Sequence, residues 1–384
     1  MPVLVFLEGW HVAGQGDFSE ICPWLQGVAQ RGKTGILSGA PERPRFPGEP
    51  LLMLLRGEGA WYRGEQDPPL AALAAQALGQ EVLPQETWAL VVWAHWLRKQ
   101  DKLLFISPER TGQNEAEIAR LGELVRSEWS REGWSVITAS RGMVLAKHGE
   151  ALRLRSFPVE WLEGESAADC LPAGPDAALL HRLLLAGQML LARCEENRLR
   201  LDAGRLSLNT PWIYGVGALN ACAPLREAFG DIRHVWSRSP WVAGAAGGGG
   251  VVWHGAPEVG SPWPEAALEA ALRQGSAVIH LDMPATLLHH GLAEERGRLL
   301  TTLDREWLQP LGRLCQRLGR GVLVLGGYPV ASGGREIAGE VPWAAIGAKG
   351  VASPRRFWHR GRFGGGSGHS GAELATLWSK LDGG

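Results

Sequence analysis

The residues AVIHLDMPATLLHHG (277–291) predict a buried strand followed by a polar loop. After an amphipathic helical stretch, the residues GVLVLGGYPVASGGREIAGEVPWAAIG (321–347) repeat the pattern. Ligands of open α/β sheets bind at the loops that leave the carboxyl ends of the strands. Both loops are therefore candidate functional loops.

The rest of the chain extends this pattern. Residues 3–7 form a continuous apolar run that predicts another buried strand, with Glu8 at its carboxyl end. Helical spacing predicts helices over 24–30, 70–78 and 176–200. Buried strands that alternate with helices indicate an α/β fold with a mostly parallel sheet and helices on both faces.

The pattern changes at about residue 86. Several short strand-like runs surround a helical stretch at 115–132, and together they indicate a small inserted α+β domain over 86–160. The core domain is then discontinuous and consists of 1–85 and 161–384.

Composition excludes several classes of protein. A net charge of −1 argues against nucleic-acid and membrane-surface partners, which need a basic face. The five cysteines are scattered, and neither a signal peptide nor a transmembrane stretch is readable, so we expect a cytoplasmic protein. The 18 tryptophans are expected mainly in the core and at domain interfaces.

Two local motifs favour ordinary interpretations. The glycine-rich run at 244–250 lacks both phosphate-loop signatures, and we expect a flexible loop there. His280, Asp282, His289 and His290 are residue types that bind zinc or manganese. Adjacent histidines on one loop rarely bind one ion together, which favours ordinary surface or core histidines.

Four segments carry a resemblance to a known family. They read VLVFLEG (3–9), PWLQGVAQRGKTGIL (23–37), PGEPLLMLLRG (47–57) and MLLARCEENRLRLDAGRLSLNTPWIYGVGAL (189–219). In register along most of the chain, they resemble the archaeal-type cofactor-independent (2,3-bisphosphoglycerate-independent) phosphoglycerate mutases of the alkaline phosphatase superfamily. The resemblance implies an alkaline-phosphatase-like core with an inserted domain.

Active members of that family bind two divalent metals and use a Ser or Thr as phosphoryl acceptor. By resemblance, the first-strand Asp has become Glu8 and the nucleophile has become Glu49. The further metal-ligand positions of the family fall on five residues, of which only the histidine is the family's own ligand: Ala285, His289, Gly327, Tyr328 and Glu336.

These replacements imply a degenerate site. Metal affinity depends on the number and geometry of the ligands, so the remaining groups should not hold two metals. We therefore expect a pseudo-enzyme without a cofactor, with a binding or regulatory role toward a phosphorylated small molecule or a protein partner. The candidate ligand-binding residues, taken from the best-matching segment, are Asn197, Arg200 and Asn209.

The alternative is an enzyme. A diverged metal-dependent phosphoglycerate mutase or phosphatase would use Glu8, His289 and Glu336 around a single Mn, Zn or Mg ion, with Asp282 or His280 assisting. The sequence leaves the identity of a ligand, a partner and the oligomeric state open.

Overall fold

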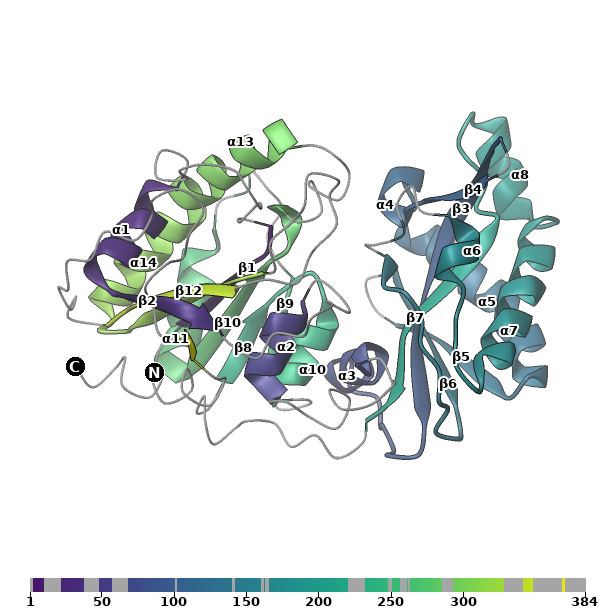
Figure 1. The fold of residues 1–384 in the computed structure, drawn as a ribbon, viewed down its shortest axis with the longest axis horizontal. Helices are drawn as coiled ribbons and strands as arrows, with labels where there is room; N and C mark the ends of the chain where they lie inside the picture. The colour runs from purple at the N-terminus through teal and green to yellow at the C-terminus, as the bar shows by residue number, and fades with distance from the viewer. Residues whose placement is uncertain are drawn as a thin grey trace. The chain divides into compact units, whose positions relative to one another are not determined.

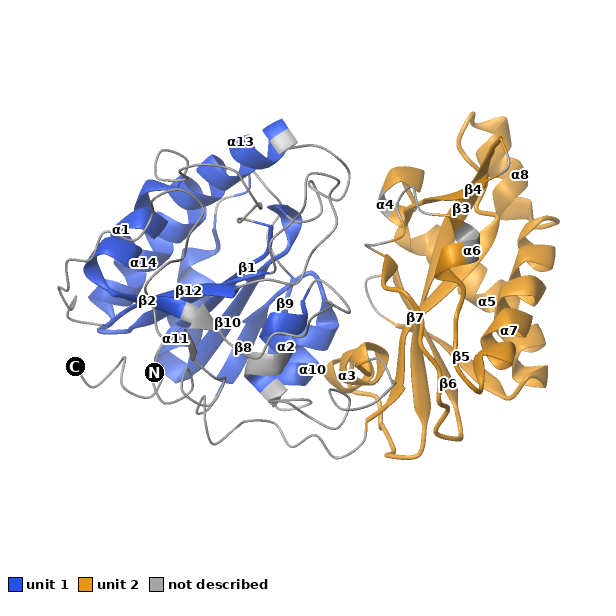
Figure 2. Ribbon diagram, viewed as in Figure 1, with its two compact units in different colours: residues 1–57, 223–384 blue, residues 58–222 orange. Residues whose placement is uncertain are grey.

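The structure is a computed structural model. The structure describes residues 3–9, 22–37, 48–56, 68–100, 102–139, 142–159, 162, 166–219, 232–247, 251–255, 261, 263–284, 293–327, 341–347 and 368–369. The chain divides into two compact units (Figure 2), residues 1–57 with 223–384 and residues 58–222.

The first unit is built on a mixed, mostly parallel sheet (Figure 1). Its eight strands lie in the order β13-β2-β12-β11-β1-β10-β8-β9. The strands are β1 (Val3–Leu7), β2 (Lys33–Leu37), β8 (Ile232–Trp236), β9 (Val252–His254), β10 (Ser276–Leu281), β11 (Val322–Gly326), β12 (Val341–Ile346) and β13 (Gly368–His369). The central strand β1 pairs in parallel with β10 and β11, and only β12 runs antiparallel to its neighbours β11 and β2.

Helices cover both faces of this sheet (Figure 1). They are α1 (Pro23–Arg31), α2 (Glu49–Arg56), α10 (Pro240–Gly247), α11 (Glu265–Gln274), α13 (Ala293–Leu303) and α14 (Gln309–Arg317). The odd-numbered side chains of β1 share one apolar cluster with α1, α11, α13 and α14. On the other face, Trp241 of α10 packs against His280 of β10. The α/β fold class expected from the sequence is confirmed.

A π-helical turn, η5 (Asp304–Leu308), joins α13 to α14 without a break. Gln309 N–H bonds back to the Asp304 carbonyl, five residues earlier. The next residue is Pro310, which has no N–H, and its ring would clash with the carbonyl four residues before it in a regular α-helix. The wider π turn relieves that clash.

The second unit has its own antiparallel sheet around the long strand β3 (Thr87–Lys99). β3 pairs with β4 (Lys102–Ile106), β6 (Met143–His148) and β7 (Thr210–Ala218), and β6 pairs with β5 (Trp134–Ala139). The helices are α3 (Leu70–Ala77), α4 (Pro108–Thr111), α5 (Glu115–Arg131), α6 (Ala167–Cys170), α7 (Ala177–Leu191) and α8 (Glu195–Asp202).

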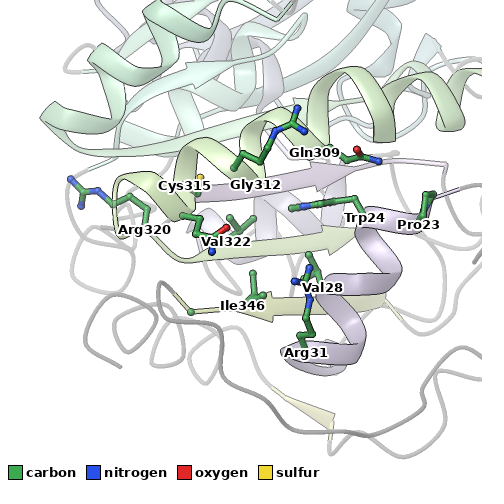
Figure 3. A pocket seen from close by; sticks show the side chains of 13 residues that line it. Pro23, Trp24, Val28, Arg31, Gln309, Gly312, Cys315, Arg320, Val322 and Ile346 are labelled. Atoms are coloured by element: carbon green, nitrogen blue, oxygen red, sulfur yellow. The ribbon is translucent and has the colours of Figure 1, made fainter.

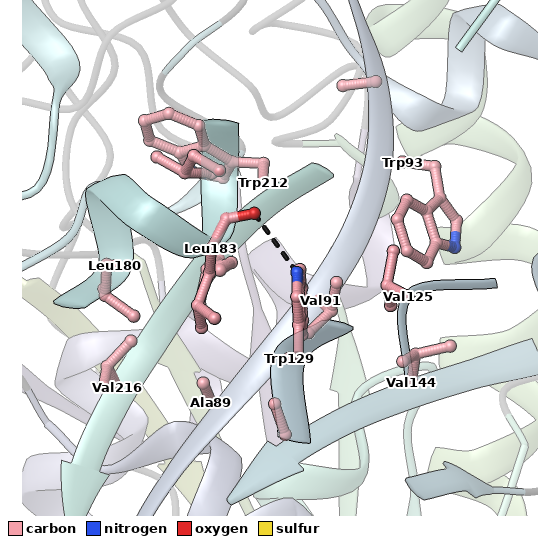
Figure 4. Close-up of a cluster of buried hydrophobic side chains, with 14 of the residues drawn as sticks. Ala89, Val91, Trp93, Val125, Trp129, Val144, Leu180, Leu183, Trp212 and Val216 are labelled. Carbon is pink, nitrogen blue, oxygen red and sulfur yellow. Dashed lines mark hydrogen bonds between the residues drawn. The ribbon is translucent and has the colours of Figure 1, made fainter. Parts of the chain in front are cut away.

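Buried tryptophans dominate the core of the second unit (Figure 4). Trp93, Trp129 and Trp212 are fully buried, and the Trp129 indole N–H donates to the Leu183 carbonyl at 3.2 Å. Such a partner offsets the cost of taking the indole N–H out of water. The tryptophans therefore serve core packing here, as the sequence predicted.

Three expectations about element and unit boundaries differ from the structure. The second unit is wider than the expected 86–160 domain, because β7 pairs with β3 along most of its length and α7 packs on β7. The single helix expected over 176–200 is two helices bent by 56° at Arg193 and Cys194. The glycine-rich run is helical as far as Gly247, where α10 ends.

Among the described helices, none is long and apolar enough by itself to span a membrane, although the bent pair α7 and α8 meets these criteria jointly.

Candidate functional site

Glu8 lies at the carboxyl end of the central strand β1. The sequence places the candidate loops at the same end of the parallel strands. The Glu8 backbone N–H continues the sheet by donating to the Leu281 carbonyl at 2.9 Å. The side chain is 3% exposed, and it emerges on the face that carries Phe6 of β1 and His280 of β10. A strand buried on both faces thus delivers a carboxyl group into an environment that excludes water.

His280 and Ser237 complete a buried polar chain with Glu8. His280 Nε2 lies 2.9 Å from Glu8 Oε1, and Ser237 Oγ lies 2.8 Å from His280 Nδ1. Ser237 follows β8, the neighbour of β10, and its hydroxyl also accepts the Ser239 backbone N–H at 2.9 Å. Both ring nitrogens of His280 are therefore engaged inside the protein.

Burial and mutual attraction set the protonation of this pair. Burial raises the pKa of the Glu8 carboxyl, and the opposing effect of His280 is smaller. Burial lowers the pKa of His280, but the charge and hydrogen bond of Glu8, with a contribution from Asp282, outweigh it and leave the pKa raised. The pair therefore retains a proton to higher pH than its separate groups would.

The N-terminus of α2 approaches the same carboxylate. Gly48 packs so closely that an added Cβ would lie 2.4 Å from the Trp241 ring and 3.3 Å from Glu8 Oε1. Glu49, the first residue of α2, is buried. The segment that resembles the nucleophile region thus lies beside the first-strand position.

Gly327 follows β11, on the other side of β1. An added Cβ at Gly327 would lie 3.3 Å from the Glu8 Cα and 3.6 Å from its Cβ. The structure therefore places three of the sequence-derived positions together: Glu8, the Gly48–Glu49 segment and Gly327. Ala285, His289, Tyr328 and Glu336 lie outside the described residues, as does His290.

Asp282 lies at the rim of this edge rather than in it. It accepts a hydrogen bond from Arg238 Nε at 2.9 Å, and this arginine is half-exposed. Sequence reasoning did not identify Ser237 as part of the site. The available signal was weak, because a serine after a short buried strand is common, whereas His280 was visible as a polar residue inside the apolar run 276–281.

The three predicted ligand-binding residues have other partners in the second unit. Asn197 Nδ2 donates to the Leu191 and Leu208 carbonyls at 2.7 Å each. Its side-chain Oδ1 accepts the Leu208 N–H at 2.6 Å. Asn209 bonds both backbone groups of Trp96. Ligand binding by these asparagines stays a prediction.

Arg200 is fully buried. It forms an ion pair with Glu117 at 2.8 Å and donates to the Leu206 and Thr111 carbonyls. A buried guanidinium needs this complete set of partners. Ligand binding by Arg200 also stays a prediction.

The described side chains do not fit a pair of divalent metals. Glu8 is engaged with His280, and Gly327 has no side chain that could ligate a metal. Within the described ranges, no group of three or more His, Cys, Asp or Glu side chains is arranged to hold a metal ion. What the described arrangement supports chemically is an internal proton shared between a carboxylate and an imidazole.

Proteins of similar sequence are found among the phosphoglycerate mutases. No family model matches this chain. The 2,3-bisphosphoglycerate-independent phosphoglycerate mutase of Methanosarcina acetivorans is 21% identical over 304 residues, which cover 75% of this chain and 73% of that protein. The Methanosarcina mazei enzyme of the same name is 23% identical over 299 residues, with the same coverage. A probable mutase of that name from Geobacter sulfurreducens is 27% identical over 42% of each chain.

A solved structure from Pyrococcus horikoshii shares the fold. The PH0037 protein from Pyrococcus horikoshii matches with a TM-score of 0.65 and 15% identity, covering 100% of this chain and 97% of that one. The cofactor-independent phosphoglycerate mutase of Thermoplasma acidophilum gives a TM-score of 0.49 at 14% identity over the full length of both chains. By the sequence comparisons, which reach 21% and 23% identity over 75% of the chain, the chain is distantly homologous to the archaeal-type 2,3-bisphosphoglycerate-independent phosphoglycerate mutases.

Proposed function

We propose that the protein is a non-catalytic relative of the phosphoglycerate mutases, with a binding or regulatory role. The observation that carries this proposal is the engagement of Glu8 with His280 at 2.9 Å. Metal coordination by this carboxyl group would compete with its hydrogen bond to the buried imidazole. Glu49 at the nucleophile position adds a second, independent obstacle, because a carboxylate cannot form a phosphoserine.

The test has two measurements on the purified protein. We expect no stoichiometric Mn, Zn or Mg by metal analysis, and no conversion of 3-phosphoglycerate to 2-phosphoglycerate with added Mn. The Methanosarcina acetivorans mutase serves as the positive control in the same assay. Conversion by this protein that a chelator abolishes would overturn the proposal.

The single-metal alternative has its own test, because Glu8 belongs to it. Hydrolysis of p-nitrophenyl phosphate with added Mn would have to be lost in Glu8→Gln, in His289→Ala and in Glu336→Gln. It would have to persist in Glu81→Gln, a change at an exposed carboxylate of the second unit. We expect no metal-dependent hydrolysis in any of these proteins.

A further inference from the structure

A groove of about 620 Å³ runs between helices α1 and α14 of the first unit (Figure 3). Its volume is in the range of small-molecule sites. Val322, the first residue of β11, and Ile346, the last of β12, lie in its floor and pair with each other in the sheet. Glu8 and Gly327 lie at the carboxyl ends of β1 and β11, so this groove opens elsewhere on the sheet.

Positive charge distinguishes the lining. Arg31, Arg313 and Arg320 contribute three guanidinium groups, and the described residues that line the groove include no Asp or Glu. Within the described part of the chain, no carboxylate lies within ion-pairing distance of Arg31 or Arg313. Arg317, also on α14 but outside the groove, pairs with Glu265 at 2.9 Å and Glu269 at 3.6 Å.

The arginines are partly held in place. Arg31 Nε donates to the Gly27 carbonyl at 3.1 Å, which folds the side chain back along α1 and uses neither Nη nitrogen. Arg320 Nη2 donates to the Leu272 carbonyl at 2.9 Å. A guanidinium that is already oriented loses less side-chain entropy when it binds an anion.

The remaining lining suits a molecule with a carbon skeleton. Val28, Val322 and Ile346 are apolar, and Trp24 lies between α1 and α14 (Figure 3). Gly312 makes room for this ring, since an added Cβ would lie 2.4 Å from Trp24 Nε1. Gln316 adds an amide group that can donate or accept hydrogen bonds, while Gln309 Nε2 already donates to Asp304 Oδ2 at 3.3 Å.

From these contacts we propose that the groove between α1 and α14 binds a phosphorylated small molecule. Guanidinium groups match the geometry of phosphate oxygens with paired hydrogen bonds, and Arg31 and Arg313, which form no ion pair with a described carboxylate, suit an anion with two or more negative charges. This site is independent of the proposed function, because it uses none of the residues at the carboxyl edge of the sheet.

The experiment measures pyrophosphate binding to the full chain by isothermal titration calorimetry at low salt. Compared with the unmodified protein, Arg31→Gln and Arg313→Gln should each weaken binding about tenfold or more, as expected when a charge-assisted hydrogen bond is lost. Arg317→Gln is the matched control on α14 and should leave binding unchanged. Thermal melting confirms that each variant is folded.

Two further arms define the ligand class and the location. Citrate should bind at least about tenfold more weakly than pyrophosphate if the groove prefers phosphate. Glu8→Gln should bind pyrophosphate like the unmodified protein, which keeps this test separate from the metal and activity measurements. Equal binding by the Arg31, Arg313 and Arg317 variants, equal affinity for citrate, or no binding of pyrophosphate would each overturn the proposal.

Discussion

At the scale of single residues, Glu8 and His280 depend on each other. Each is a buried ionisable group, and the hydrogen bond between them offsets part of the cost of removing both from water. Ser237 then occupies the second nitrogen of the imidazole ring, so the ring cannot turn without breaking two hydrogen bonds. The buried Glu8–His280 pair therefore keeps its proton to a higher pH than the separate groups would.

The raised pKa values of both groups make stability depend on pH. The folded state holds these protons more tightly than the unfolded state, so their stabilising contribution is complete at low pH. It is lost as pH rises above the ordinary values of 4.5 for Glu8 and 6.5 for His280 and passes the raised values of the folded state.

We therefore predict that the free energy of unfolding falls with rising pH above about 6.5, and that the double variant Glu8→Gln with His280→Asn shows a flatter dependence. Urea unfolding at a series of pH values measures both slopes. Identical slopes in the two proteins would contradict this account of the pair.

Sequence reasoning named both Glu8 and His280 as candidates, but it did not predict the hydrogen bond between them. The apolar run 3–7 fixes where β1 ends, and the resemblance marks the next residue. The hydrogen bond to His280 joins positions 272 residues apart, and it follows from the parallel pairing of β1 with β10. Local sequence patterns do not show which strands pair in the sheet.

At the scale of elements, the break between α7 and α8 shows a similar limit. The buried apolar positions of α7 end at Leu191, but the residues that follow are still helix formers and no Gly or Pro marks the bend. The chain turns because Cys194 is extended and Asn197 of α8 caps the Leu191 carbonyl at the end of α7. A side-chain cap of this kind comes from three-dimensional contact, so periodicity could not predict it.

Two helical glycines provide a matched prediction. Gly312→Ala on α14 should lower the free energy of unfolding by about 1–3 kcal/mol, because the added methyl overlaps the rigid Trp24 ring. Gly297→Ala on α13 meets no atom within 4 Å and should raise it by about 0.5–1 kcal/mol through helix propensity alone.

Urea unfolding of both variants provides the comparison, and the unmodified protein is the reference. Gly312→Ala should also weaken pyrophosphate binding, since Gly312 lines the groove beside Trp24. A gain in stability from Gly312→Ala would show that the Trp24 ring can move away at little cost.

At the scale of the whole molecule, the chain folds as two units with separate cores. The mostly parallel sheet could be predicted from its buried runs, because strands without alternation indicate burial on both faces. The extent of the second unit could not be predicted from the sequence, because β7 pairs with β3 although more than a hundred residues separate them. The expected boundaries at 86 and 160 followed local composition, which does not show that pairing.

The second unit is continuous in sequence, and we predict that residues 58–222 fold when produced alone. Its core contains five fully buried tryptophans: Trp88, Trp93, Trp129, Trp134 and Trp212. The fragment should therefore show blue-shifted tryptophan emission and one cooperative unfolding transition in urea. Emission typical of exposed tryptophan in the absence of denaturant would count against an autonomous core.

The π turn at Asp304–Leu308 also fixes the helical phase of α14. One residue advances an α-helix by about 100°, so a π turn shifts every later side chain around the axis relative to an uninterrupted helix. Asp304 at the start of the turn caps α1 through the Trp24 and Leu25 N–H groups, and Gly312 two turns later meets the Trp24 ring. Removal of one residue here would rotate Arg313 of α14 away from α1 while leaving the apolar content of α14 unchanged.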